Sequence, residues 1–171
     1  MTDKLSIEDS FKVEFAKSLF PLECLVSEDP FFCTEEAFIL ALVACWDLVR
    51  EYSVSSDDVL STHFISTLHQ TLASQIGAPE PGQFVDDGGV NGSWSNFTEE
   101  LNVKEIIEGF GACDVIAQLL GGGHLPNLEL TIGWLCINTL RLRSGYSPPF
   151  YPHQNIHEEH IECLEWALLF F

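Results

Sequence analysis

The chain has 171 residues, 46% of them hydrophobic and 19% charged, and its 7 Lys and Arg against 26 Asp and Glu give a formal net charge of −19. This length suits one folding unit, and the apolar fraction excludes a disordered or low-complexity chain. The shortage of bases disfavours direct binding to nucleic acid or to anionic membranes, which need Lys and Arg. We therefore expect one acidic domain over residues 1–171.

Two helices are predicted in the first third of the chain. Apolar residues recur every four positions from Ile7 to Leu19, which predicts an amphipathic helix over residues 6–20 that Pro21 ends. Residues 35–51 are apolar on all sides in the middle of the segment, which is typical of a helix at the centre of a fold.

A helix and a long loop are predicted next. Ser56, Asp57 and Asp58 form an expected helix start, and Gly77 an expected end. Residues 78–97 hold two prolines and four glycines without periodicity, which predicts an acidic surface loop.

The remaining apolar patterns are again helical. They predict helices from Thr98 or Asn102 to Glu108, over 112–120, over 128–143 and over 156–171. Six or seven helices with little strand signal indicate an all-α fold, an irregular bundle around a central apolar helix.

The distribution of charge is as informative as its total. Between Glu51 and Val103 the chain has eight acids and no Lys or Arg. Acidic pairs that follow Ser or Thr are expected in first helical turns, where the macrodipole favours negative charge. This explains where acids occur but leaves the missing bases unexplained. The pairs are Glu8-Asp9, Glu35-Glu36, Asp57-Asp58 and Glu99-Glu100.

These features favour binding to a basic protein, although a merely solvated acidic surface would look the same. The expected partner is a nuclease, toxin or nucleic-acid-binding complex, engaged by an inhibitor or immunity-type protein, one form of which is a nucleic-acid mimic. Trp94 is either an interface anchor or a buried anchor of its loop. The predicted partner-binding residues are Asp57, Asp58, Glu80, Asp86, Asp87, Trp94, Glu99 and Glu100.

Two alternatives depend on the C-terminal segment. His153, His157, His160 and Cys163 have ligand types suited to zinc, which would fit a small metal-dependent enzyme or sensor, but their spacing is not that of H-E-x-x-H. The other alternative is a helical adaptor that forms a homodimer through its C-terminal helix. The preferred interpretation needs no cofactor.

The six cysteines include no C-x-x-C pair, and no secretory signal is visible, so a reducing cytoplasm is expected. Cys45 and Cys136 lie in apolar runs and are expected to be small buried hydrophobes. The longest fully apolar run, residues 37–46, has half the length of a membrane span of about 20 residues.

A calcium loop starting at Asp87 is a further, weaker interpretation. It would place Gly92 at the expected sixth position, but Gly89 at the third and Thr98 at the twelfth supply no carboxylate. A glycine-rich turn is favoured there.

Overall fold

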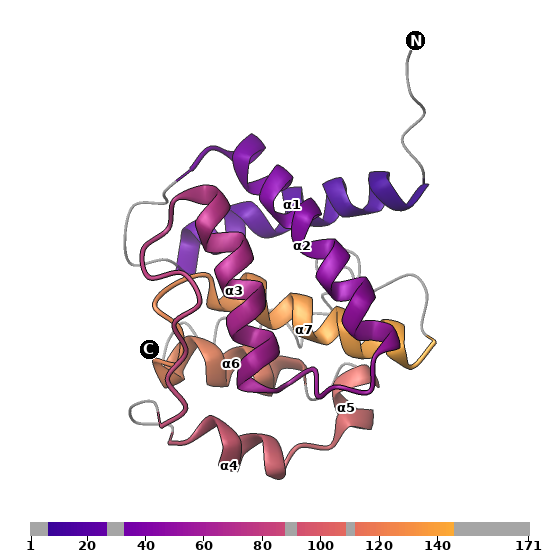
Figure 1. The fold of residues 1–171 in the computed structure, drawn as a ribbon, viewed down its shortest axis with the longest axis vertical. Helices are drawn as coiled ribbons and strands as arrows, with labels where there is room; N and C mark the ends of the chain where they lie inside the picture. Colours follow the sequence, from indigo (N-terminus) through magenta and orange to yellow (C-terminus); the bar gives the residue numbers. More distant parts are fainter. Residues whose placement is uncertain (1–6, 27–32, 88–91, 109–111, 146–171) are drawn as a thin grey trace.

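The computed structural model describes residues 7–26, 33–87, 92–108 and 112–145, and within these ranges the chain forms seven helices and no strand (Figure 1). The predicted all-α bundle is confirmed. The helices are α1 (Ile7–Val26), α2 (Glu35–Val54), α3 (Thr62–Ile76), α4 (Trp94–Glu99), α5 (Val103–Glu108), α6 (Ala112–Gly122) and α7 (Glu129–Arg143). The helix predicted over 156–171 lies outside the described residues.

Helix α7 occupies the centre of the bundle. Its residues from Leu130 to Leu140 are all buried, and it packs against α1, α2, α3, α5 and α6. The expected central apolar helix therefore exists, but it is not α2. That helix packs mainly against α1, α3 and α7, and Leu40 on its outer side is 65% exposed.

Helix α1 continues through Pro21, where the sequence predicted its end. Proline removes one backbone hydrogen bond and crowds the preceding turn, so tertiary contacts have to offset that cost. Aromatic packing against α2 supplies some of them, since the Phe20 and Phe38 ring centroids are 5.4 Å apart. One turn beyond Phe20, the buried Glu23 bonds to Thr131 of α7.

Helix α3 begins later than Ser56, the predicted start. Asp58 instead holds a turn, in which its Oδ1 accepts a hydrogen bond from the Leu60 N–H at 2.9 Å. Ser61 then caps the helix by accepting from the Phe64 N–H at 3.2 Å. The predicted end at Gly77 is confirmed, with φ at +73° in the left-handed region that glycine adopts freely.

The predicted loop over 78–97 is shorter than expected, because Ser93 caps α4 and the helix begins at Trp94. We refer to residues 77–93 as loop 77–93. Helices α4 and α5 are separate, whereas the sequence predicted one helix there. The ends of α6 and α7 lie within two residues of their predicted positions.

Candidate functional site

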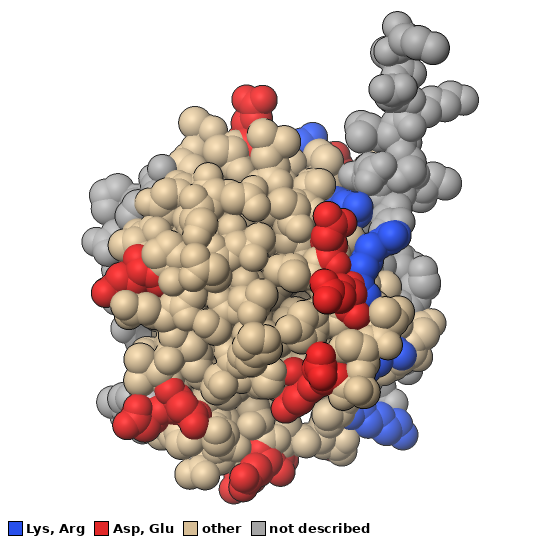
Figure 2. Space-filling model, viewed as in Figure 1, with Lys and Arg blue, Asp and Glu red and all other residues tan. Residues whose placement is uncertain are grey.

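The segment without Lys or Arg, from Glu51 to Val103, forms one face of the molecule, which we call the base-free face. In Figure 1, α3 crosses the front, loop 77–93 descends at the left and α4 lies along the bottom. Figure 2 shows the same view, with an uncharged area over α3, carboxylates at several places around it, and Lys and Arg along the right-hand side. This area is uncharged because α3 contains no Asp, Glu, Lys or Arg.

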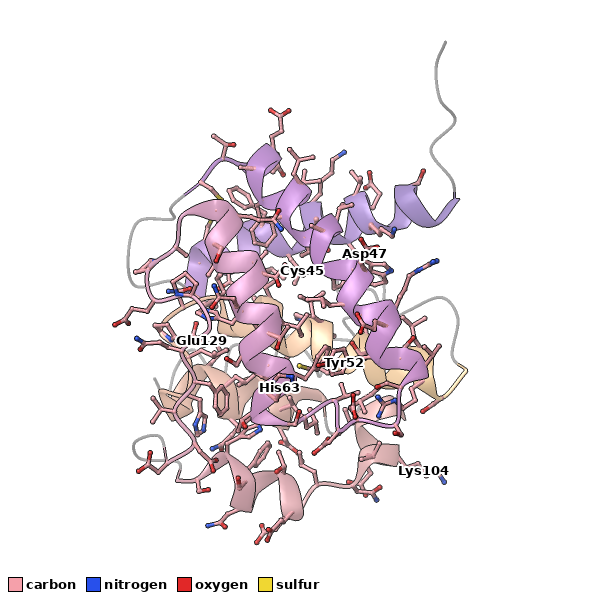
Figure 3. All side chains as sticks on the ribbon, viewed as in Figure 1. Cys45, Asp47, Tyr52, His63, Lys104 and Glu129 are labelled. Atoms are coloured by element: carbon pink, nitrogen blue, oxygen red, sulfur yellow. The ribbon has the colours of Figure 1, made fainter. Side chains whose placement is uncertain are left out.

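The uncharged area is rich in hydrogen-bonding side chains. Ser, Thr, Gln and His occupy the outer side of α3, while apolar residues from Phe64 to Ile76 face the core. Figure 3 shows His63 near the start of this helix. The exposed or half-exposed polar residues are Thr62, His63, Ser66, Thr67, Gln70, Thr71, Ser74 and Gln75.

Most of the predicted partner-binding acids are accessible. They come from the turn before α3, from loop 77–93 and from the end of α4, so they surround the uncharged strip. Lys104, the first base after them, projects from α5 at the lower edge of this face (Figure 3). The exposed acids are Asp57, Asp58, Glu80, Asp87, Glu99 and Glu100.

Two of the four acidic pairs do not occupy first helical turns, so that part of the sequence prediction is wrong. Asp57 and Asp58 precede the cap of α3, while Glu99 is the last residue of α4 and Glu100 its C-cap. The macrodipole does not stabilise negative charge at a helix C-terminus. Helix geometry thus explains the Glu35-Glu36 pair of α2 but not the acids of the base-free face.

Trp94 is buried and is not accessible to a partner in this conformation. Its side chain is 1% exposed, and its Nε1–H donates to the Leu60 carbonyl at 2.8 Å. Its rings lie 5.8 Å from the Phe84 ring and 5.5 Å from the His124 ring, centroid to centroid. The structure therefore favours the buried-anchor alternative, in which Trp94 ties α4 to the chain before α3.

Asp86 is also occupied within its own loop. Its Oδ1 accepts from the Ser95 N–H at 2.8 Å and its Oδ2 from the Ser95 hydroxyl at 2.7 Å. These bonds, joined by a weaker one from Ser93 at 3.4 Å, hold the pKa of Asp86 below its ordinary value of 3.8. Asp86 thus fixes the start of α4, and its contacts explain a carboxylate in this loop without calcium.

His69 of α3 holds the middle of loop 77–93. Its Nδ1 accepts from the Gly82 N–H at 2.9 Å, so its proton is on Nε2, which donates to the Asn127 Oδ1 at 3.0 Å. The Asn127 amide nitrogen in turn donates to the Pro79 carbonyl at 3.1 Å. Because His69 is fully buried, desolvation lowers its pKa from the ordinary 6.5, against an opposing effect of the Asn127 bonds.

His124 holds the next part of the loop with the opposite tautomer. Its Nδ1 donates to the Val85 carbonyl at 2.6 Å, and the Val85 N–H donates to the His124 carbonyl at 2.8 Å. Its Nε2 is therefore the acceptor toward the Gln118 amide nitrogen at 3.2 Å. The imidazole stacks on Phe84, with ring centroids 5.6 Å apart. Sequence reasoning missed both histidines, since their partners are backbone atoms of the loop and side chains of Asn127 and Gln118 that no local pattern connects to them.

Glu23 is a second buried ionisable group that the sequence did not identify. Its Oε2 accepts from the Thr131 N–H at 2.9 Å and from the Thr131 hydroxyl at 2.5 Å. Helix α7 starts at Leu128 with φ at +63° and no side-chain cap, so Glu23 of α1 fills the role of a capping acceptor from outside the helix. Burial raises the pKa of Glu23 to about 7, although both bonds from Thr131 lower it.

Metal ligands and nucleophilic cysteines are the other candidate site residues. No group of three or more His, Cys, Asp or Glu is arranged in the described ranges to hold a metal ion. His153, His157, His160 and Cys163 lie outside them. Cys45 and Cys136 are buried as predicted, and burial raises the pKa of Cys45 to about 12, which leaves a poor nucleophile.

No protein-family model matches the chain, and neither the curated proteins nor the solved structures include a match to it. Among the helices that the structure describes, none is long and apolar enough to cross a membrane.

Proposed function

We propose that this protein is an acidic protein-binding module that engages a basic partner through its base-free face. The partner belongs to the class of nucleases, toxins or nucleic-acid-binding complexes, and the module acts as an inhibitor or immunity-type escort. One observation carries the proposal. The stretch from Glu51 to Val103 contains no Lys or Arg, and its described part places α3, residues 77–87 and α4 on the face seen in Figure 1, with exposed carboxylates at Asp57, Asp58, Glu80, Asp87, Glu99 and Glu100.

The positions of these acids support a role in binding rather than in folding. Glu99 and Glu100 lie at a helix end that does not favour negative charge, and Glu80 and Asp87 lie on the exposed part of loop 77–93. Asp86, in contrast, has its carboxylate engaged by Ser95. We therefore assign partner binding to the six exposed acids, of which Asp58 also holds the turn before α3, and a structural role alone to Asp86.

The surface fits a partner with a specific pattern of charge. Lys and Arg around the rim of the partner would pair with the six carboxylates, while the Ser, Thr and Gln side chains of α3 offer uncharged donors and acceptors between them. Rim charges mainly accelerate association and select among partners. Binding should accordingly be fast and strongly weakened by salt.

The test is a pull-down from native lysate with a charge-neutralised variant. The variant replaces the exposed acids with their amides, which changes the net charge from −19 to −13 (−19 + 6). We expect wild type to retain a Lys- and Arg-rich protein at low salt and to release it at about 0.5 M salt, where the Debye length is roughly 4 Å. The neutralised variant should fail to retain it. The replaced acids are Asp57, Asp58, Glu80, Asp87, Glu99 and Glu100.

A matched control variant distinguishes the effect of this face on partner binding from the effect of total charge. It neutralises six exposed acids outside the base-free face and reaches the same net charge of −13. The control should retain the partner as wild type does. Equal loss in both variants, or equal retention, contradicts a role for this face. The control acids are Glu14, Glu35, Glu36, Asp47, Glu105 and Asp114.

The metal-dependent enzyme and the C-terminal homodimer remain predictions from sequence. Both depend on residues beyond Gly145, outside the described part of the chain.

A further inference from the structure

We infer that residues 77–87, the part of loop 77–93 next to α3 that the structure describes, form a proton-gated element, held in place by neutral His69 and released when this imidazole takes up a proton. The gate is a property of the free protein. Its consequence for partner binding rests on the proposed function, because the loop carries Glu80 and Asp87.

The gate follows from the hydrogen bond between His69 and Gly82. His69 Nδ1 can accept the Gly82 N–H only while it carries no proton. A second proton on the ring would place two N–H groups against each other at a contact that is now 2.9 Å. The Gly82 N–H belongs to the backbone and cannot rotate away. Either the loop moves, or His69 remains unprotonated.

The surroundings of Gly82 leave the loop no other way to adjust. The Gly82 carbonyl accepts from the Ser66 hydroxyl of α3, so both polar backbone atoms of this residue are bonded to the helix. Gly82 has φ at +77°, and a Cβ at this position would collide with the Gln70 side chain. Gly82 therefore fits closely against α3, and protonation of His69 breaks their hydrogen bond rather than lengthening it.

Among the described residues, no neighbouring charge acts on His69, whose pKa reflects burial and the Asn127 bonds. The loop carries Glu80, Asp86 and Asp87, His124 is bonded to it, and α7 begins with Glu129. Asp86 faces His124 rather than His69. The two helices packed against α3 carry the remaining titratable or charged side chains, which are Glu35, Glu36, Cys45, Asp47, Arg50, Glu51 and Tyr52 of α2 and Cys136, Arg141 and Arg143 of α7.

His124 also holds the loop, but through the opposite arrangement. Its Nδ1 donates to the Val85 carbonyl, and its acceptor nitrogen faces the side-chain amide of Gln118 rather than a backbone N–H. The loop bond that needs an unprotonated ring nitrogen is therefore the one between His69 and Gly82.

The direction of the pH effect follows from linkage. The held loop keeps His69 neutral, whereas in the released loop the ring titrates near its ordinary pKa of 6.5. The released state thus binds more protons below that pH. Its equilibrium constant should rise as pH falls below 6.5, by up to about tenfold per pH unit, until the held state itself takes up the proton.

The experiment measures amide hydrogen exchange of the free full chain by NMR between pH 7.5 and 5, corrected for the intrinsic rate. We expect the protection of the Gly82 amide to fall by up to about tenfold per pH unit below 6.5, while amides of Leu135 and Ile137 in α7 stay protected. His69→Gln should remove the slope. His63→Gln, a change on the exposed face of the same helix, should retain it.

Three results would overturn the gate: constant protection of Gly82 down to pH 5, a slope that persists in His69→Gln, or simultaneous loss of protection in α7. A further measurement covers the case in which His69→Gln does not fold. Side-chain ¹⁵N shifts of His69 in wild type should report the Nε2–H tautomer at pH 7.5, and an Nδ1–H tautomer would exclude the mechanism. All these measurements use the free protein without a partner. They therefore test the gate independently of the proposed function.

Discussion

Helix α7 and loop 77–93 are both anchored in the same bundle, but by different forces. The helix buries every residue from Leu130 to Leu140. The described residues of the loop, 77–87 with 92 and 93, are mostly exposed or half-exposed and are held by hydrogen bonds to His69, His124 and Asn127. Apolar burial does not respond to pH near neutrality, whereas a bond to an imidazole acceptor does. Acid should therefore act on the loop first.

The largest expected effect comes from the centre of α7. Leu135→Ala removes a fully buried side chain and should lower the free energy of unfolding by about 2–5 kcal/mol. Leu40→Ala, at a position that is 65% exposed, is the control and should change it by less than about 0.5 kcal/mol. Urea denaturation measures both. Similar losses in the two variants would disprove the central position of α7.

The next largest effect is the pH dependence of the free energy of unfolding that arises at the start of α7. Because the pKa of Glu23 is raised from 4.5 to about 7 in the fold, its contribution to stability is complete below pH 4.5 and is lost as pH rises through 7. Glu23→Gln keeps an acceptor for Thr131 but cannot ionise. Relative to wild type, it should therefore gain about 3 kcal/mol in unfolding free energy between pH 4 and pH 8.

Glu23→Ala is the companion variant. It leaves the buried Thr131 donors unpaired and should cost about 1–3 kcal/mol at acidic pH. Chemical denaturation across the pH range measures both changes. A constant difference between Glu23→Gln and wild type over this range would show that Glu23 does not titrate as the structure implies.

The smallest expected effect on stability concerns two glycines, Gly77 at the end of α3 and Gly82 within loop 77–93. Gly77→Ala and Gly82→Ala both place a side chain at positive φ and should each cost about 1 kcal/mol or more. Only at Gly82 does the new Cβ also meet a neighbour, Gln70. Amide exchange should therefore show a larger loss of loop protection in Gly82→Ala than in Gly77→Ala. Equal losses would mean that the fit against α3 is loose.

The fold was predictable where local patterns decide it. Helical periodicity and the Gly77 end of α3 are visible in neighbouring residues. The errors come from contacts between distant residues. Pro21 is a strong local stop signal that the tertiary contacts of α1 outweigh, and the identity of the central helix depends on which apolar helix is surrounded.

The candidate site was predictable only in part. Exposed acids such as Asp57 and Glu80 follow from composition and chain position. The roles of Asp86 and Trp94 do not, because each depends on partners brought close by folding, Ser95 for the carboxylate and Leu60 for the indole. His69 gives no sequence signal, since its partner at Gly82 is a backbone group that any residue could supply.

The cap that Glu23 provides for α7 also constrains the order of folding. The donor and acceptor residues are 108 positions apart in the chain. During synthesis, Glu23 therefore cannot cap the first turn of α7 until the 108 residues that follow it have been made. Such a long-range closure raises contact order and slows folding, and meanwhile the apolar surface of α1 and α2 is available to chaperones or to other chains.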